Sequence, residues 1–140
     1  MASYNKFQVF TKDLIEGKHN FASNTFKVML TNTAPVNTNS IKADLTEISA
    51  GNGYTAGGTV TTITSSTSSG VAKTVGTDVV FTAAGGSIGP LRYAVLYNDT
   101  QTSPAKPLVA WWDYGSSITM NDTETLTVDF DAANGIFTVT

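Results

Sequence analysis

The sequence predicts a mainly β domain, an antiparallel β-sandwich or barrel with one short N-terminal helix. From about residue 26 onward, apolar and polar residues alternate in several short segments, the period of strands with one buried face. Clusters rich in glycine, asparagine and serine separate these segments, as is typical of turns. The length of 140 residues fits a single domain, residues 1–140, large enough to bury a core without disulfides, and the chain has no cysteine.

Residues 4–16 carry the only convincing helical pattern. Phe7, Phe10 and Leu14 follow the spacing i, i+3, i+7, and Gly17 is placed to end the helix. An amphipathic helix of this length must dock on a sheet, either its own or that of a neighbouring copy. Phe7 and Phe10 are therefore candidate interface residues.

The sheet begins with residues 26–31, where three apolar residues alternate with Lys27, Met29 and Thr31 and predict a half-buried strand. Residues 49–58 form a glycine-rich loop whose spacing misses the dinucleotide-binding fingerprint and precedes no helix. Residues 59–70 are almost entirely threonine and serine, which predicts a weakly specified strand or a long exposed loop.

Three strands are predicted in the second half of the chain, each with one apolar face. These faces are Val79, Phe81 and Ala83; Leu91, Tyr93, Val95 and Tyr97; and Leu108, Ala110, Trp112 and Tyr114.

The C-terminus carries the sequence signal of a tight hairpin. Asn134-Gly135 is typical of a type I′ turn, which would place Phe130 opposite Val139. In that register Phe130, Ala132, Phe137 and Val139 share one face.

Composition argues against most enzyme classes. The chain has one histidine, one arginine and only 14% charged residues, whereas catalytic, metal and phosphate sites need these side chains. We therefore expect no catalytic residues, no metal and no cofactor. A net charge of −3 with scattered lysines argues against nucleic acid. The longest apolar runs are too short to span a membrane, and residues 1–6 lack a secretory signal, so the expectation is a soluble protein made in the cytoplasm.

Two weak candidate sites have simpler explanations. His19 follows the predicted helix, where a surface or capping role is expected. The pairs Asp122/Glu124 and Asp129/Asp131 would hold their carboxyls roughly 6 to 7 Å apart on a strand, as in an inverting glycosidase, but on a solvated face. Asp129 and Asp131 also suggest a calcium loop, although Ala133 occupies the third ligand position.

Trp111 and Arg92 are the stronger candidates for an interface. If Trp112 points inward, its neighbour Trp111 must point outward and be exposed in the monomer, unless both faces of the sheet are covered. An exposed tryptophan suits a protein interface or a sugar-stacking platform. Arg92 is either an ion-pair partner of Asp113 or an interface anchor.

Several segments resemble a family of small virion proteins of tailed bacteriophages. They are residues 5–7, 13–21, 23–32, 47–54, 92–98 and 112–115, which are spread along most of the length of the chain. Among the roles of such proteins, head decoration (cement) is the one we expect for this chain. The resemblance implies a β-rich protein, commonly a homotrimer, that binds the major capsid protein on the outer surface of the expanded head and stabilises the shell. It implies no catalytic residues.

Two other functions remain open. Members of such families also serve as tail or baseplate components, where a receptor- or glycan-binding module would use Trp111 and the tyrosines for stacking. A cell-wall or capsule hydrolase would instead depend on the carboxylate pairs, including Asp129 and Asp131.

Overall fold

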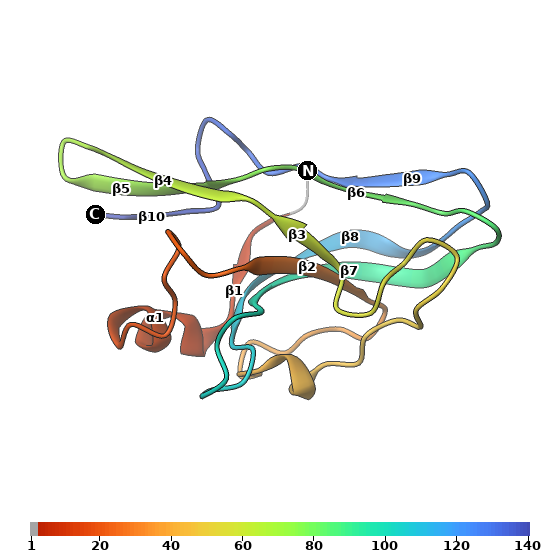
Figure 1. The fold of residues 1–140 in the computed structure, drawn as a ribbon, viewed down its shortest axis with the longest axis horizontal. Helices are drawn as coiled ribbons and strands as arrows, with labels where there is room; N and C mark the ends of the chain where they lie inside the picture. The colour runs from red at the N-terminus through yellow and green to blue at the C-terminus, as the bar shows by residue number, and fades with distance from the viewer. Residues whose placement is uncertain (1–2) are drawn as a thin grey trace.

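The computed structural model describes residues 3–140 and confirms the mainly β fold with antiparallel sheets and an N-terminal helix (Figure 1). The elements are β1 (Asn5–Lys6), α1 (Gln8–Ile15), β2 (Phe26–Thr31), a 3₁₀ turn (Lys42–Asp44), β3 (Thr59–Thr61), β4 (Ile63–Ser68), β5 (Val71–Gly76), β6 (Val79–Thr82), β7 (Ile88–Asn98), β8 (Leu108–Met120), β9 (Thr125–Val128) and β10 (Phe137–Val139).

The strands form two layers. One is a five-stranded sheet with the order β1-β8-β7-β2-β3, and the other consists of two ribbons, β10-β5-β4 and β6-β9, which lie end to end above it in Figure 1. Only Thr62 separates β3 from β4, so the chain passes from one layer to the other at that residue. Hydrogen bonds from Thr61 and Thr62 to Thr77 hold the crossing point.

Apolar residues cover both faces of the five-stranded sheet. The main core lies between the layers and includes Phe26, Val28, Leu30, Phe81 and Leu96. A smaller cluster on the other face consists of Phe7, Met29, Val95, Tyr97 and Leu108, all 0% exposed. The prediction that residues 26–31 form a strand is confirmed, but the prediction that it is half-buried is wrong, because Met29 and Thr31 are buried as well.

The helix is shorter than the predicted range of residues 4–16. Asn5 and Lys6 pair with Trp111 and Ala110 as β1, and Phe7 has extended backbone angles (φ −72°, ψ 139°). Phe7 therefore packs in the smaller cluster, whereas Phe10 packs in the main core. The sequence does have the helical spacing, but residues 5 and 6 pair with β8, so the helix begins only at Gln8.

Register shifts change the predicted faces of β7 and β8. The pairing of these strands is irregular between Leu91 and Tyr93 and again between Leu96 and Tyr97. A shift of this kind moves the following side chains to the opposite face. Leu91 therefore lies in the main core, whereas Val95 lies in the smaller cluster. On β8, Ala110 lies in the main core and Leu108 lies in the smaller cluster.

The predicted C-terminal hairpin does not form. A type I′ turn needs positive φ at both central residues, and Gly135 has φ +78° whereas Asn134 does not. Residues 129–136 instead carry the chain from β9, which pairs with β6, to β10, which pairs with β5. Val139 is 47% exposed, so the predicted common face with Phe130 is also wrong.

The Thr/Ser-rich segment, residues 59–70, is not a long loop but forms β3, β4 and the turn that follows β4. Residues 63–76, called the arm below, form a hairpin whose register is unbroken from Ile63↔Gly76 to Ser68↔Val71. Its two turn residues, Ser69 (φ 50°) and Gly70 (φ 81°), have the backbone of a type I′ turn. Every residue from 64 to 71 is exposed, and the tip projects past the body at the left of Figure 1.

Candidate functional site

Two of the four predicted interface residues are core residues. Phe7 is 0% exposed and Phe10 is 3% exposed, so neither is available to a partner in this structure. Trp111 is half-buried and its ring lies 4.6 Å from that of Phe7. The expectation of an exposed Trp111 is therefore wrong, because Phe7, the residue after β1, packs on this face of β8.

Arg92 pairs with Asp113, one of the two roles expected for it. Its Nε lies 2.8 Å from Oδ1 and its Nη2 lies 3.1 Å from Oδ2, a bidentate pair on adjacent strands. The guanidinium also stands 5.4 Å from the ring centre of Tyr93. Asp113 accepts a further hydrogen bond from the backbone N–H of Gly115. The hydrogen bonds from Arg92 and Gly115 lower the pKa of Asp113.

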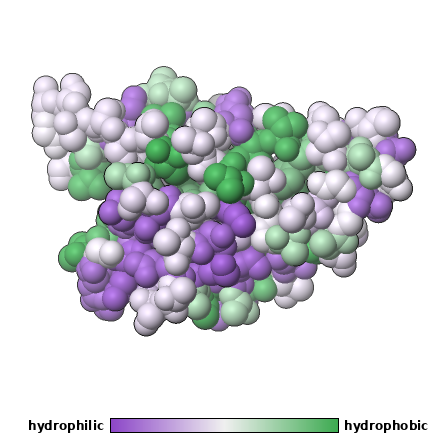
Figure 2. Space-filling view, viewed as in Figure 1, coloured by the Kyte–Doolittle hydropathy of each residue, from purple (hydrophilic) through white to green (hydrophobic). Residues whose placement is uncertain are grey.

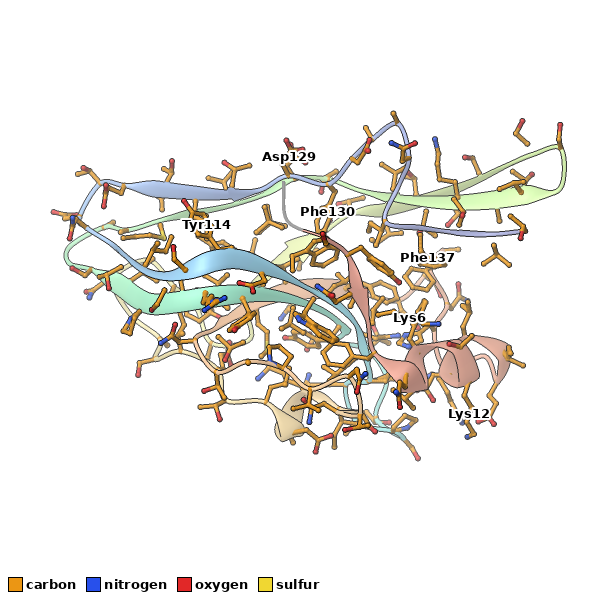
Figure 3. All side chains as sticks on the ribbon, turned by 180° about the vertical axis from the view of Figure 1, so that it is seen from behind. Lys6, Lys12, Tyr114, Asp129, Phe130 and Phe137 are labelled. Atoms are coloured by element: carbon orange, nitrogen blue, oxygen red, sulfur yellow. The ribbon has the colours of Figure 1, made fainter. Side chains whose placement is uncertain are left out.

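An open cleft of about 1040 Å³ lies between the two layers beside this ion pair. Its inner wall is apolar and contains Leu30, Leu91 and Phe130, and Figure 3 shows Phe130 lying between the layers. Tyr114 and Tyr4, which are 57% and 37% exposed, stand at its rim. Trp112 lines the cleft with its ring against Tyr4 and Phe130, at centroid distances of 6.0 and 5.3 Å. The cleft therefore combines an apolar inner wall with aromatic and charged side chains at its open side.

A half-buried polar cluster around Glu47 holds the long loop against the sheet, where the Tyr54 hydroxyl accepts the Leu30 N–H. Its carboxylate accepts hydrogen bonds from the Tyr54 hydroxyl (2.7 Å), the Gly57 N–H (2.6 Å) and the Lys42 ammonium (2.9 Å). Burial opposes ionisation of Glu47, but these donors outweigh it and lower its pKa. Burial raises the pKa of Tyr54, so the phenol stays protonated. A carboxylate and a phenol fixed in these forms act as structural groups.

Glycine is required where this loop meets the sheet. Gly58 has φ +83°, and a Cβ at this position would lie 1.9 Å from the Val28 carbonyl oxygen. Only glycine allows the two backbones to approach so closely.

His19 is buried at 5% exposure, so the prediction of a surface or capping role is wrong. Its Nδ1 lies 3.2 Å from the Asn98 amide nitrogen, and its ring packs among Phe10, Phe21 and Phe26. Burial lowers the pKa of His19 to about 4. The imidazole is therefore neutral at pH 7 and part of the core, since no acidic group hydrogen-bonds to it among residues 3–140.

Three of the four carboxylates proposed for a hydrolase accept hydrogen bonds that hold turns or loops. Asp122 accepts the Gly85 N–H and Glu124 accepts the Asn121 N–H. Asp131 accepts hydrogen bonds from the Asn134 side chain and from the backbone N–H groups of Asn134 and Ala133, which lower its pKa. A general acid needs a raised pKa, and the environment of Asp131 has the opposite effect. Asp129 is exposed on the outer side of the ribbon (Figure 3).

Sequence reasoning missed Glu47, Tyr54 and Asn98 as organising residues. Asn98 donates to Asn24 and accepts the N–H groups of Thr100 and Gln101. All three residues lie in segments on which the family resemblance rests. The one clue in the sequence was that these polar residues stand inside the motifs that carry the resemblance. Their hydrogen-bond partners could not be inferred, because several are distant in sequence.

Comparisons with protein-family models, curated proteins and solved structures found no match to this chain. Within residues 3–140, no group of three or more acidic or histidine side chains could hold a metal ion. In the part of the chain that the structure describes, no helix is long and apolar enough to cross a membrane.

Proposed function

We propose that this protein is a non-catalytic structural protein of a bacteriophage virion, which decorates the outer surface of the head and stabilises the shell. The observation that carries the proposal is the contrast between polar groups that hydrogen bonds within the fold already hold and polar groups that are left exposed. The groups that could do chemistry, His19, Glu47 and Asp131, are all held by the fold itself. What remains outside is a projecting ribbon of serine and threonine, which suits contact with other chains.

The partner and the place come from the family resemblance. It gives the major capsid protein as the partner, the outer capsid surface as the location and a homotrimer as the assembly. Several identical contacts to a repeating shell raise the overall avidity without any single strong contact. A closed ring also limits uncontrolled association of a protein with exposed strand edges. Catalysis, a metal and a cofactor have no part in this proposal.

Binding to heads tests the proposal directly. Purified protein is titrated onto expanded heads that lack it, and onto unexpanded precursor heads as the control, with bound protein measured by cosedimentation. We expect saturable binding to expanded heads and little binding to precursors. Absence of binding to expanded heads would overturn the proposal.

The cleft favours one second candidate, a tail or baseplate module that binds a cell-surface glycan. Aromatic side chains beside paired polar groups are typical of sugar sites, and Tyr114, Tyr4 and the Arg92–Asp113 pair meet at this rim. The stacking residue of this alternative is Tyr114, because Trp111 is packed against Phe7.

Titration of host surface glycans into the protein, with binding measured by tryptophan fluorescence, distinguishes the two functions. A glycan site would be weakened strongly by Tyr114→Ala and left intact by Val80→Ala, an exposed residue outside the cleft. The decoration proposal expects no saturable glycan binding by either protein.

A further inference from the structure

The outer edge of β4 is an unpaired strand edge. Sheet order places β4 at the end of the ribbon β10-β5-β4, and no other strand among the described residues pairs with that edge. The type I′ turn makes Ser68 and Val71 a hydrogen-bonded pair. Because bonding alternates along an antiparallel ladder, Ser66 and Thr64 also bond to β5. The N–H and C=O groups of Ile63, Ser65 and Thr67 therefore point away from β5, toward the unpaired edge.

This edge lacks the protection that the free edge of β8 has. On β8, the Asp113 carboxylate accepts a hydrogen bond from the Gly115 N–H, and the pairing of β8 with β7 is irregular at this point. Charged side chains and bulges of this kind prevent edge-to-edge association. The outward edge of β4 has no charge, no proline and no bulge. In Figure 2 the projecting end of the arm is pale, neither strongly hydrophilic nor strongly hydrophobic.

We propose that β4 is a contact between two copies of this chain, paired antiparallel about a two-fold axis at Ser65. The residues whose backbone groups point outward must face one another, so only registers that pair odd-numbered residues with odd-numbered residues are possible. The register with Ser65 opposite Ser65 also pairs Ile63 with Thr67, and it uses all three outward residues of both copies. It makes about six backbone hydrogen bonds, more than a shift in either direction.

The side chains of β4 are compatible with this register. Thr64 lies opposite Ser66 of the second copy, and Ser65 lies opposite itself, so small hydroxyl side chains meet without like charges. Both copies then form one continuous six-stranded sheet, β10-β5-β4-β4-β5-β10. The contact surface is small compared with the roughly 1,200–2,000 Å² of stable complexes, so it is weak in dilute solution and strengthens when copies are held close together.

The contact goes beyond the proposed function. Its two-fold symmetry differs from the symmetry of a trimer, so it links neighbouring oligomers or pairs single copies. It does not depend on the capsid protein, and its failure would leave head binding untouched.

Cysteine crosslinking tests the contact and its register together. The native chain has no cysteine, so Ser65→Cys introduces a single thiol. Across the two-fold axis the two Cα atoms would lie about 5.5 Å apart, a separation that a disulfide accepts. In Ser68→Cys, which is equally exposed on the same strand, the two Cα atoms would lie about 20 Å apart. We expect a disulfide-linked dimer from Ser65→Cys under mild oxidation and far less from Ser68→Cys.

Light scattering of the cysteine-free protein gives the second measurement. With concentration raised toward about 1 mM, the mean mass should rise from the mass of the basic unit toward twice that value. Ser65→Pro removes an outward N–H and should abolish the rise, whereas Thr138→Pro, whose N–H faces away from β5 on the opposite edge of the ribbon, should preserve it.

Equal crosslinking of Ser65→Cys and Ser68→Cys, or a mass that does not depend on concentration, would overturn the proposal. If the wild-type mass stays constant but β4 variants lose binding to heads, the edge binds a strand of the shell protein and the second-copy proposal is wrong.

Discussion

The body of the molecule and its arm are built from the same kind of strand but are stabilised differently. In the body, β2 and β7 have buried residues on both faces, and their side chains fill two apolar clusters. In the arm, β4 has a regular ladder to β5 but only Ile63 packs against the core. A regular ladder is therefore no evidence of a core beneath it. The body has the apolar contacts to be stable alone. The outer half of the arm depends instead on backbone hydrogen bonds and on contacts with other chains.

The largest expected effect is a cavity in the body. Phe7→Ala removes a ring that is 0% exposed and packs against Trp111, so we expect a loss of about 3–5 kcal/mol in the free energy of unfolding. Urea unfolding followed by tryptophan fluorescence measures it. A loss below about 1 kcal/mol would mean that the smaller cluster does not support the body.

The Glu47 cluster should come next. Glu47→Ala leaves the Tyr54 hydroxyl and the Gly57 N–H without their acceptor, and we expect a loss of about 3 kcal/mol. Glu16→Ala is the control, because its ion pair with Lys12 is exposed to solvent and should contribute little to stability. Equal losses in the two variants would contradict the structural role of Glu47.

Acid should weaken the body through His19. Its pKa of about 4 in the folded protein lies below the ordinary value of 6.5, so the unfolded chain binds more protons between these values and stability falls as pH falls. From pH 7 to pH 5 the expected loss is about 2 kcal/mol. This window lies above the range in which the carboxylates with lowered pKa, such as Glu47 and Asp131, lose their contribution.

Unfolding in urea at both pH values, for the wild type and His19→Gln, measures the effect. The variant should lose the part of the pH dependence that comes from the imidazole. A pH dependence that is unchanged by the substitution would show that His19 is not buried in neutral form.

The smallest effect is expected in the arm, and valine offers a matched pair. Val95→Ala in the body removes a side chain that is 0% exposed, whereas Val71→Ala in the arm removes one that is 37% exposed. We expect losses of about 2 kcal/mol and less than about 0.5 kcal/mol, respectively. Similar losses from urea unfolding would remove the distinction between arm and body.

The same contrast explains what could be predicted from the sequence. Alternation identified β2, β6, β7 and β8, because each strand has at least one apolar face. It failed where tertiary pairing decides the outcome: β1 shortens the helix, and register shifts redistribute Leu91 and Leu108 between clusters. Asn134-Gly135 suggested a local hairpin, but β10 finds its partner in β5, more than 60 positions earlier in the chain.

The candidate site was less predictable than the fold. The Arg92–Asp113 pair was among the expected alternatives because its residues lie on neighbouring strands. The cover on Trp111, the burial of His19 and the Glu47–Tyr54 contact depend on how segments distant in sequence pack together. Periodicity within one segment carries no information on such contacts.

Hydrogen exchange of backbone amides, compared between free protein and protein bound to expanded heads, tests the central claim most directly. In the free protein we expect the amides of β2 and β7 to exchange only through global unfolding, and those of Ile63, Ser65 and Thr67 to exchange rapidly. On heads, these three amides should become protected. If they stay unprotected on heads, or if protection appears only around Tyr114 and the cleft, the arm makes no contact on the head and the account of the arm as a contact surface is wrong.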